Sequence, residues 1–249
     1  MEILVYKRIG ETTGELSSRI KNKYKSKKVA ICGKLDPMAR GLTRVLTDEK
    51  TKLMNKFLAN DKTYEFKLVL GVKTDTDDIM GMIKSIDIKI SYYIEDIKAK
   101  IDAICRFEEQ HFHPFSAIKI KIGDKRQSLH QWTQERDMDM SELPKKKVQV
   151  LSKEYGDTQI ISVDNYYKNI KNRLGTVNFN NISCFRVPEI LTYWDECMQT
   201  MHKSNVKYLT ILPVKLRVSS GFYIRMLPYY LDNIYNIKSH IYDINRTKL

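Results

Sequence analysis

The sequence has few cysteines and no long hydrophobic run. Its four cysteines are far apart and none forms a C-x-x-C pair, so neither a structural zinc site nor a disulfide scaffold is indicated. No apolar segment approaches the length of a membrane span, and the N-terminal residues lack the apolar region of a signal peptide. We therefore expect no membrane association and reduced thiols in a reducing intracellular compartment, most simply the cytoplasm, with an organellar or viral origin left open.

Metal ligands at their usual spacings are also missing. The acidic segment 74–81 does not have the twelve-residue spacing of an EF-hand, and His111 and His113 have no obvious third ligand. The chain contains no internal repeat and no low-complexity linker. The sequence thus predicts a single domain over residues 1–249 that binds no metal ion.

Negative charge is scarce relative to positive charge. Lys and Arg number 43 against 30 Asp and Glu, which gives a formal net charge of +13 and a pI near 9.4. An excess of this size indicates a polyanionic partner, and without a membrane segment nucleic acid is the better candidate. AT-rich coding sequence also produces many Lys, Ile, Asn and Tyr residues. This bias explains the aromatic and basic run 166–173 as well as RNA binding does.

Hydrophobic periodicity predicts a mixture of strands and helices in a globular chain. Residues 123–144 are polar and interrupted, which indicates an excursion from the core, and the pattern over 156–210 is too weak to assign. Alternating apolar residues predict strands over 1–7, 62–71 and 213–218, and helical spacing predicts helices over 42–46, 52–58, 94–107 and 226–231.

One acidic residue stands in unusual surroundings. Asp36 lies in the segment GKLDPMARG, residues 33–41, between two glycines and directly before Pro37. The proline disfavours helical backbone at Asp36, and the glycines allow tight turns and the close approach of a ligand. Lys34 and Arg40 favour the ionised carboxylate. The combination suits an acid presented from a loop to a substrate, although an ordinary charged turn fits this segment equally well when it is taken alone.

Seven short motifs follow one another along the chain. They are, each with the pattern that it resembles in parentheses, KRIGETT at 7–13 (K-P-x-G-x-T-S), GKLDPMARG at 33–41 (G-x-L-D-P-x-A-x-G), KTY at 62–64 (K-x-Y), GVKTDTDDIMG at 71–81 (G-x-x-T-D-T-x-D-x-x-G), QHFHPFSAIK at 110–119 (Q-x-P-P-x-Y-S-A-x-K), SSGFYIR at 219–225 (S-x-G-x-Y-I-R) and INRT at 244–247 (L-R-R-T). With few departures they resemble the motifs of the TruB-type pseudouridine synthases, including the related synthases of guide-RNA particles. Each motif is weak alone, but seven in family order are specific and cover about residues 1–155 and 213–249.

The resemblance implies an RNA pseudouridine synthase that needs no cofactor. Such an enzyme moves the glycosidic bond of a uridine from N1 to C5 of the same base, after the target nucleotide has left its stack. Asp36, Tyr64 and Arg225 are then the expected catalytic residues. Asp36 would attack the ribose carbon or remove the 2′ proton, and Arg225 would pair with Asp36. Tyr64 would stack on the uracil and take part in removal of the C5 proton.

The resemblance also implies a fold, a substrate and its contacts. We expect an α+β pseudouridine synthase fold with a mixed, mostly antiparallel twisted sheet, flanking helices and a central basic catalytic cleft. The expected partner is RNA, in the first place the T arm of tRNA, bound by a monomer and gripped by a thumb at about 121–147. The expected substrate-binding residues are Tyr223, which lines the pocket, Ile244, which packs beneath the base, and the cations Lys7, Lys34, Lys62, Lys125 and Arg126.

The chain departs from the family pattern in several places. Ile31 stands where a histidine is usual, which leaves the identity of the target RNA more open than the chemistry. Ser220 replaces the lysine of S-K-G-x-Y, residues 156–210 are longer than the family core suggests, and we expect no C-terminal PUA domain. A catalytically inactive RNA-binding or RNA-folding protein of the same fold is the alternative function. Retention of the complete expected catalytic set argues against it.

Overall fold

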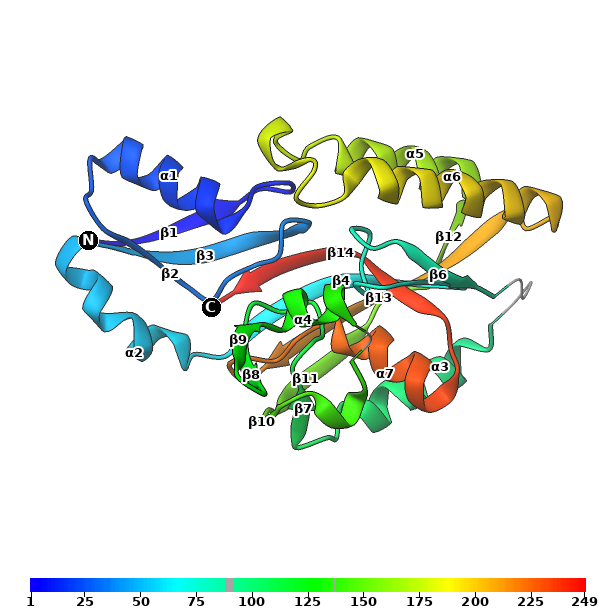
Figure 1. The fold of residues 1–249 in the computed structure, drawn as a ribbon. Helices are drawn as coiled ribbons and strands as arrows, with labels where there is room; N and C mark the ends of the chain where they lie inside the picture. Colours follow the sequence, from blue (N-terminus) through cyan, green and yellow to red (C-terminus); the bar gives the residue numbers. More distant parts are fainter. Residues whose placement is uncertain (88–91, 137) are drawn as a thin grey trace.

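A computed structural model describes residues 1–87, 92–136 and 138–249 of the chain (Figure 1). Residue 137, within the expected thumb segment, lies outside the described residues. The strands are β1 Glu2–Lys7, β2 Val29–Cys32, β3 Ala39–Thr47, β4 Lys62–Leu70, β5 Val72–Thr74, β6 Ile83–Ile86, β7 Glu109–His111, β8 Lys119–Ile122, β9 Lys125–Ser128, β10 Lys145–Lys147, β11 Val150–Tyr155, β12 Gln159–Ser162, β13 Tyr208–Val218 and β14 Ser239–Lys248. The helices are α1 Thr13–Tyr24, α2 Met54–Leu58, α3 Ile94–Ile104, α4 Leu129–Glu135, α5 Val163–Leu174, α6 Val187–Lys203 and α7 Met226–Tyr235, with 3₁₀ helices η1 Asp48–Leu53, η2 Met140–Glu142 and η3 Phe179–Asn181.

An eight-stranded sheet crosses the molecule. Its central order is β1-β3-β14-β4-β13-β11, with β2 added beside β3 and β12 beside β13. Neighbouring strands run antiparallel except β3 and β14, which are parallel. The expected α+β class with a mixed, mostly antiparallel sheet is confirmed. The strands predicted over 1–7, 62–71 and 213–218 are β1, β4 and the second half of β13.

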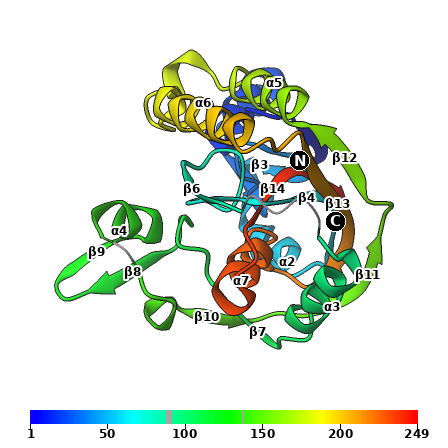
Figure 2. The ribbon, with the colours of Figure 1, turned by 90° about the vertical axis from the view of Figure 1, so that its right-hand side faces the viewer.

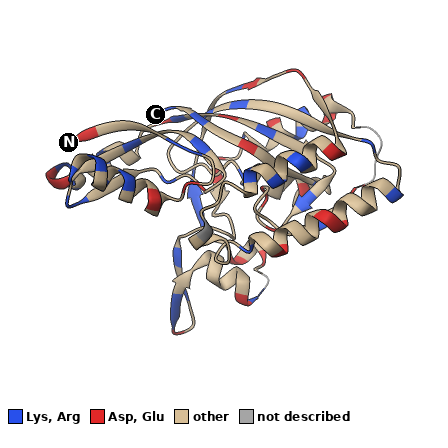
Figure 3. Ribbon diagram, turned by 90° about the horizontal axis from the view of Figure 1, so that it is seen from above, with Lys and Arg blue, Asp and Glu red and all other residues tan. Residues whose placement is uncertain are grey.

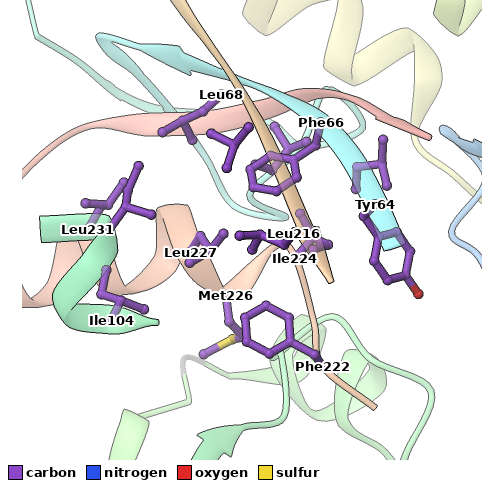
Figure 4. Packing of buried hydrophobic residues seen from close by; sticks show 14 of the residues in the cluster. Tyr64, Phe66, Leu68, Ile104, Leu216, Phe222, Ile224, Met226, Leu227 and Leu231 are labelled. Carbon is purple, nitrogen blue, oxygen red and sulfur yellow. The ribbon is translucent and has the colours of Figure 1, made fainter. Parts of the chain in front are cut away.

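Helices α3 and α7 cover one face of the sheet (Figure 2). The buried stripe of α3 consists of Ile97, Ile101 and Ile104, which recur at helical spacing as predicted, although the helix ends earlier than residue 107. These side chains share one apolar cluster with β4, β13 and α7 (Figure 4). Tyr64 lies at the edge of this cluster, and its hydroxyl oxygen points away from it (Figure 4). The cluster therefore anchors β4, which carries Tyr64, and α7, which begins directly after Arg225.

Helices α5 and α6 lie side by side on the opposite face (Figure 1). They come from residues 156–210, to which the sequence pattern assigned no element. Trp194 of α6 packs against Tyr166 of α5 and His240 of β14, with ring centroids 5.8 and 5.6 Å apart. The Tyr166 hydroxyl lies 2.5 Å from His240 Nε2, and Tyr166 is fully buried. Tyr166 is thus a core residue, which rules it out as a base-stacking residue on the surface.

The helix predicted over residues 42–46 is wrong. These residues belong to β3, where Leu46 pairs with Glu2 of β1 on one edge and with Ala30 of β2 on the other. The apolar residues at 42, 45 and 46 fit a helical spacing equally well in a short window. Pairing along both edges decides for the strand, because local preference over so few residues is weaker than a complete ladder of backbone hydrogen bonds.

A hairpin of β8 and β9, followed by α4, stands away from the sheet (Figure 2). Lys and Arg residues lie along this arm (Figure 3). These elements fall within the polar stretch that the sequence separates from the core. Within the described ranges, no helix has the length and apolar character needed to cross a membrane.

Replacing Trp194 by alanine should lower the free energy of unfolding by about 3–5 kcal/mol, because it empties a packed aromatic site. The Trp194 side chain is only 1% exposed. The matched control is Tyr193→Ala, whose side chain is 42% exposed; we expect a loss below about 1 kcal/mol there. Urea denaturation of both variants measures the difference, and equal losses would contradict the packing of α6 on the sheet.

Candidate active site

A cavity of about 570 Å³ opens where several distant parts of the chain meet. Its lining includes Asp36 from the loop before β3, Tyr64 from β4, Tyr223 and Arg225 from the turn before α7, and Ile244 from β14. These residues were singled out from separate motifs. The fold brings them to one place because β14 lies next to both β3 and β4.

The backbone around Asp36 requires glycine at two positions. Gly33 has a φ of +80°, and a Cβ atom there would lie 3.1 Å from Lys62 Cε. Gly41 has a φ of +126°, and a Cβ atom there would lie 2.3 Å from the carbonyl oxygen of Arg246. Only glycine combines such backbone angles with this close approach. The two glycines therefore fix the path of the loop that presents Asp36.

Lys7 holds the backbone of this loop from the interior of the protein. Its ammonium donates hydrogen bonds to the carbonyl oxygens of Pro37 at 3.0 Å, Ala39 at 2.7 Å and Arg8 at 3.0 Å. The backbone N–H of Gly10 also donates to the Pro37 carbonyl, at 2.9 Å. Lys7 is fully buried. The prediction that Lys7 contacts the substrate is therefore wrong: its three donors are used inside the protein, so it acts as a support for the loop.

Arg225 forms the ion pair expected with Asp36. Its Nε lies 2.8 Å from Asp36 Oδ2, while Nη1 donates to the Thr76 carbonyl at 2.9 Å and Nη2 to the Phe115 carbonyl at 3.2 Å. The Arg225 side chain is 5% exposed and that of Asp36 is 45% exposed. Burial alone would lower the pKa of Arg225, but the carboxylates of Asp36 and Asp78 raise it, so the guanidinium stays charged. A fixed cation thus orients a carboxylate that still faces the cavity.

A second acidic layer lies behind Arg225. Asp78 Oδ1 accepts hydrogen bonds from Thr76 Oγ1 at 2.7 Å and from the backbone N–H of Met80 at 2.9 Å. Asp77 pairs with the ammonium of Lys73. Burial raises the pKa of both Asp77 and Asp78 to about 6, against the opposing effect of nearby cations. Both carboxylates are therefore largely ionised at neutral pH and balance the buried positive charge.

Aromatic and apolar side chains form one wall of the cavity. Tyr64 and Ile244 are buried at 8% and 7% exposure, and Tyr223 is part of the same lining. Gln110 holds Tyr223 in place, because its Oε1 accepts from the Tyr223 N–H at 2.7 Å and its Nε2 donates to the Tyr223 carbonyl at 3.1 Å. Burial raises the pKa of Tyr64, so its phenol is neutral at neutral pH. This wall has the flat, apolar character that a nucleobase needs for stacking.

Besides Arg225, four cations line the cavity. Lys34 is exposed at its mouth. The Lys62 ammonium donates to the carbonyl oxygens of Leu58, the last residue of α2, and of Asn60, at 3.2 and 2.6 Å, so it lines the cavity with a largely occupied head group. Arg246 Nη1 donates to the Gly33 carbonyl at 3.0 Å. Lys146 lies 4.6 Å from the centre of the Tyr223 ring. The cavity therefore carries positive charge beside one exposed carboxylate, which suits a polyanionic substrate.

Lys125 and Arg126 do not line the cavity. Both are exposed on β9, in the projecting hairpin, and the Lys125 ammonium lies 2.6 Å from Glu135 Oε1. Contacts from these residues would reach parts of a substrate outside the cavity. Across the described parts of the chain, no three His, Cys, Asp or Glu side chains gather into a group that would bind a metal ion.

Sequence reasoning missed several residues that shape the site. Arg246 and Gln110 lie inside motifs that were recognised, but their partners became visible only in the fold. Lys146 was included in the thumb segment but not among the site residues. His113 is fully buried, with Nδ1 3.3 Å from Arg225 Nη1. The signal for His113 was present, since it stands where the pattern Q-x-P-P-x-Y-S-A-x-K has its second proline.

Comparison with known proteins identifies the family. The sequence profile of the TruB family pseudouridylate synthase N-terminal domain matches residues 21–165, more than half of the chain. The chain belongs to the TruB family. It is 38% identical over 122 residues to tRNA pseudouridine synthase B of Acholeplasma laidlawii, a match that covers 49% of this chain and 43% of that protein. It is 31% identical over 182 residues to tRNA pseudouridine synthase B of Endomicrobium trichonymphae, covering 70% of this chain and 77% of that protein.

The fold of this TruB family member also resembles a solved structure. The crystal structure of a Cbf5-Nop10-Gar1 complex contains a chain that matches with a TM-score of 0.53 and 12% sequence identity, over 99% of this chain and 48% of that one. At this identity the likeness concerns the fold alone. The expected pseudouridine synthase fold is confirmed.

Ile31, which stands where the family pattern has histidine, belongs to the core of this TruB chain. It is 9% exposed and packs with Leu16 and Ile20 of α1 and with Val45 of β3. A polar side chain at this position would have to leave that cluster. Ile31 therefore supplies an apolar interior contact shortly before the loop that carries Asp36.

We expect the stability contribution of Lys7 to depend on pH. Burial lowers the pKa of Lys7 from 10.5 to about 8. Between these two pH values the folded chain has lost the Lys7 proton while the unfolded chain still binds it. The free energy of unfolding should therefore rise with pH across that window. Urea denaturation at pH 7.5 and 9.5 should show wild type gaining stability relative to Lys7→Met.

The control for this comparison is Lys50→Met, which changes an exposed lysine. Its stability difference from wild type should be the same at both pH values. A pH-independent difference for Lys7→Met as well would contradict the buried position of the Lys7 ammonium.

Proposed function

We propose that this protein is an RNA pseudouridine synthase that isomerises a uridine in the T loop of tRNA or in a T-loop-like RNA. The observation that carries this proposal is the ion pair between the exposed carboxylate of Asp36 and the buried guanidinium of Arg225, at the floor of a cavity with an aromatic wall. RNA folding without catalysis would need the basic surface, but it would not need a carboxylate oriented in this way.

The reaction needs no external reagent. The N1–C1′ bond of the uridine breaks, the base turns, and a C5–C1′ bond forms. The proton on C5 leaves and N1 gains one, so the product is an isomer of the substrate. The enzyme must hold the detached base, supply a carboxylate at the ribose and accept a proton from C5. These three demands correspond to a stacking wall, an oriented acid and a nearby polar group.

We assign Asp36, Tyr64 and Arg225 to these demands. Asp36 acts on the ribose, either at C1′ or at the 2′ proton, because it is the carboxylate that faces the cavity. Arg225 keeps Asp36 ionised and oriented, since three sides of its guanidinium are bound to the protein. Tyr64 stacks on the uracil and takes part in C5 proton removal. Tyr223 and Ile244 hold the flipped base, and their stacking offsets the unstacking cost of a few kcal/mol.

We further propose that the projecting hairpin serves as a thumb on the RNA. Residues 121–147 include Lys125 and Arg126, which are exposed outside the cavity. Lys34 and Lys62 both line the cavity, and we assign to the exposed Lys34 the contact with the phosphates next to the target nucleotide. The relatives named tRNA pseudouridine synthase B support tRNA as the first substrate to test. In this assignment residues 1–249 act as one catalytic domain.

Replacing Asp36 by alanine should abolish pseudouridine formation, with a fall in kcat of at least about 10³-fold, because the variant lacks the group that acts on the ribose. Wild type and variant are incubated with unmodified total RNA, and pseudouridine is mapped chemically. The control is Asp164→Ala, an exposed carboxylate on α5 at 78% exposure, which should act like wild type.

The outcomes separate the candidate functions. A wild-type protein that binds RNA but forms no pseudouridine on any RNA would indicate the inactive RNA-binding alternative. Product formation that survives Asp36→Ala would overturn the site assignment. Activity on an RNA other than tRNA would change the substrate and leave the reaction in place.

The double change Lys125→Gln and Arg126→Gln should weaken RNA binding and reduce its dependence on salt. Each lost phosphate contact lowers the slope of log Kd against log salt by about 0.7 to 0.9. Binding is measured with Asp36→Ala, so that no product forms. Lys168→Gln with Lys203→Gln removes the same charge from exposed positions on α5 and α6. An equal effect of this control pair would contradict a thumb role for the hairpin.

A further inference from the structure

His113 occupies a buried position between the ion pair and the acidic layer behind it. It is 0% exposed. Its Nε2 lies 3.0 Å from Asp77 Oδ2, its Nδ1 lies 3.3 Å from Arg225 Nη1, and the backbone N–H of Phe115 donates to Nδ1 at 3.1 Å. Both ring nitrogens are therefore engaged, and one of them faces the group that orients Asp36.

The partners of His113 select one tautomer. Asp77 also accepts a hydrogen bond from the Lys73 ammonium, so it is an acceptor on both oxygens. Nε2 must then carry the ring proton and donate it to Asp77. Nδ1 is left with a lone pair, which accepts from the Phe115 N–H and from Arg225 Nη1. The opposite tautomer would set a donor against two donors.

His113 supports Arg225 in two ways. It accepts directly from Nη1, and it fixes the backbone of Phe115, whose carbonyl accepts from Nη2 at 3.2 Å. The other guanidinium contacts are Nε with Asp36 and Nη1 with the Thr76 carbonyl. Removal of the Nδ1 acceptor would therefore loosen two of the contacts that set the direction of Arg225.

The surroundings of His113 alternate in charge. On one side are Arg225 and Asp36, and on the other are Asp77, Lys73 and Asp232, with Lys73 Nζ 3.8 Å from Asp232 Oδ2. The ring of Tyr229, from α7, closes the site with its centroid 6.2 Å from that of His113. A neutral imidazole suits this place, since it can donate to the anion on one side and accept from the cation on the other without adding charge.

We propose that His113 is a positioning residue for the isomerisation: its Nδ1 holds the Arg225 guanidinium in the direction that orients the Asp36 carboxylate. The inference rests on the proposed function for its kinetic consequence. Its structural basis is independent of that function, so the two can fail separately.

Two substitutions separate the two ring nitrogens. In His113→Asn, Oδ1 follows the same bonded path as Nδ1 and keeps an acceptor towards Arg225, but the donor to Asp77 is lost. In His113→Gln, Nε2 follows the bonded path of the ring Nε2 and keeps the donor to Asp77, but the acceptor is lost. Because each variant keeps one contact and loses the other, a general loss of packing affects both alike.

We expect His113→Gln to lower kcat by about 10²-fold, as for a reacting group displaced by about 1 Å, while the Kd for RNA stays as in wild type. His113→Asn should retain most of the wild-type kcat. Thermal unfolding of both variants reports stability separately. A folded Gln variant with wild-type kcat, or losses of kcat that follow stability and not the retained nitrogen, would overturn the proposal.

A measurement on the wild-type protein covers the case in which a variant does not fold. The ¹⁵N NMR shifts of the His113 ring should show Nε2 protonated and Nδ1 unprotonated near neutral pH, with the resonances assigned through His113→Asn or, if needed, by selective labelling. A proton on Nδ1 would overturn the proposal whether or not the protein has activity. An inactive wild type with the expected tautomer would count against the proposed function and leave the position of His113 supported.

Discussion

A guanidinium removed from water must find an acceptor for its N–H groups and a counter-charge, because an unmatched buried charge is strongly destabilising. Arg225 meets this demand with Asp36 in front, carbonyls of Thr76 and Phe115 at its sides and two further aspartates behind it. Three segments far apart in sequence must therefore sit around one side chain. This requirement links the loop before β3, the turn after β5 and the segment after β7 into a single site.

The positive charge of the chain has two physical uses. Lys7 and Arg246 are buried and donate hydrogen bonds to backbone carbonyls of the loop that carries Asp36. Lys125 and Arg126 are exposed on the hairpin and are available to an anionic partner. The net charge alone does not separate these uses, since a buried lysine and an exposed one count equally in it. Burial and hydrogen-bond partners decide which cations are accessible to an anionic partner.

The long segment 156–210 packs against the sheet and supports the strand β14. Its helices α5 and α6 cover the sheet face opposite the cavity and place Trp194 against β14, the strand that also carries Ile244 and Arg246. Their apolar residues are spaced by three and four positions among many polar ones, so the pattern is weak until both helices are seen on the sheet. The segment therefore supports β14 from that face, and Phe185, which lies between η3 and α6, also lines the cavity.

The sequence by itself determined β1, β4, the second half of β13, the loop with Asp36 and the family. Alternating apolar residues mark these strands, a proline and two glycines mark the loop, and seven motifs in order mark the family, so each of these signals is contained in the sequence itself. It assigned residues 42–46 to a helix, where pairing on both edges of β3 decides for a strand. Only the tertiary structure decided that Lys7 is buried, that Ile31 is a core residue and that His113 lies against Arg225. These facts depend on contacts between segments that are distant in the chain, and no local pattern carries information about a partner that arrives through folding.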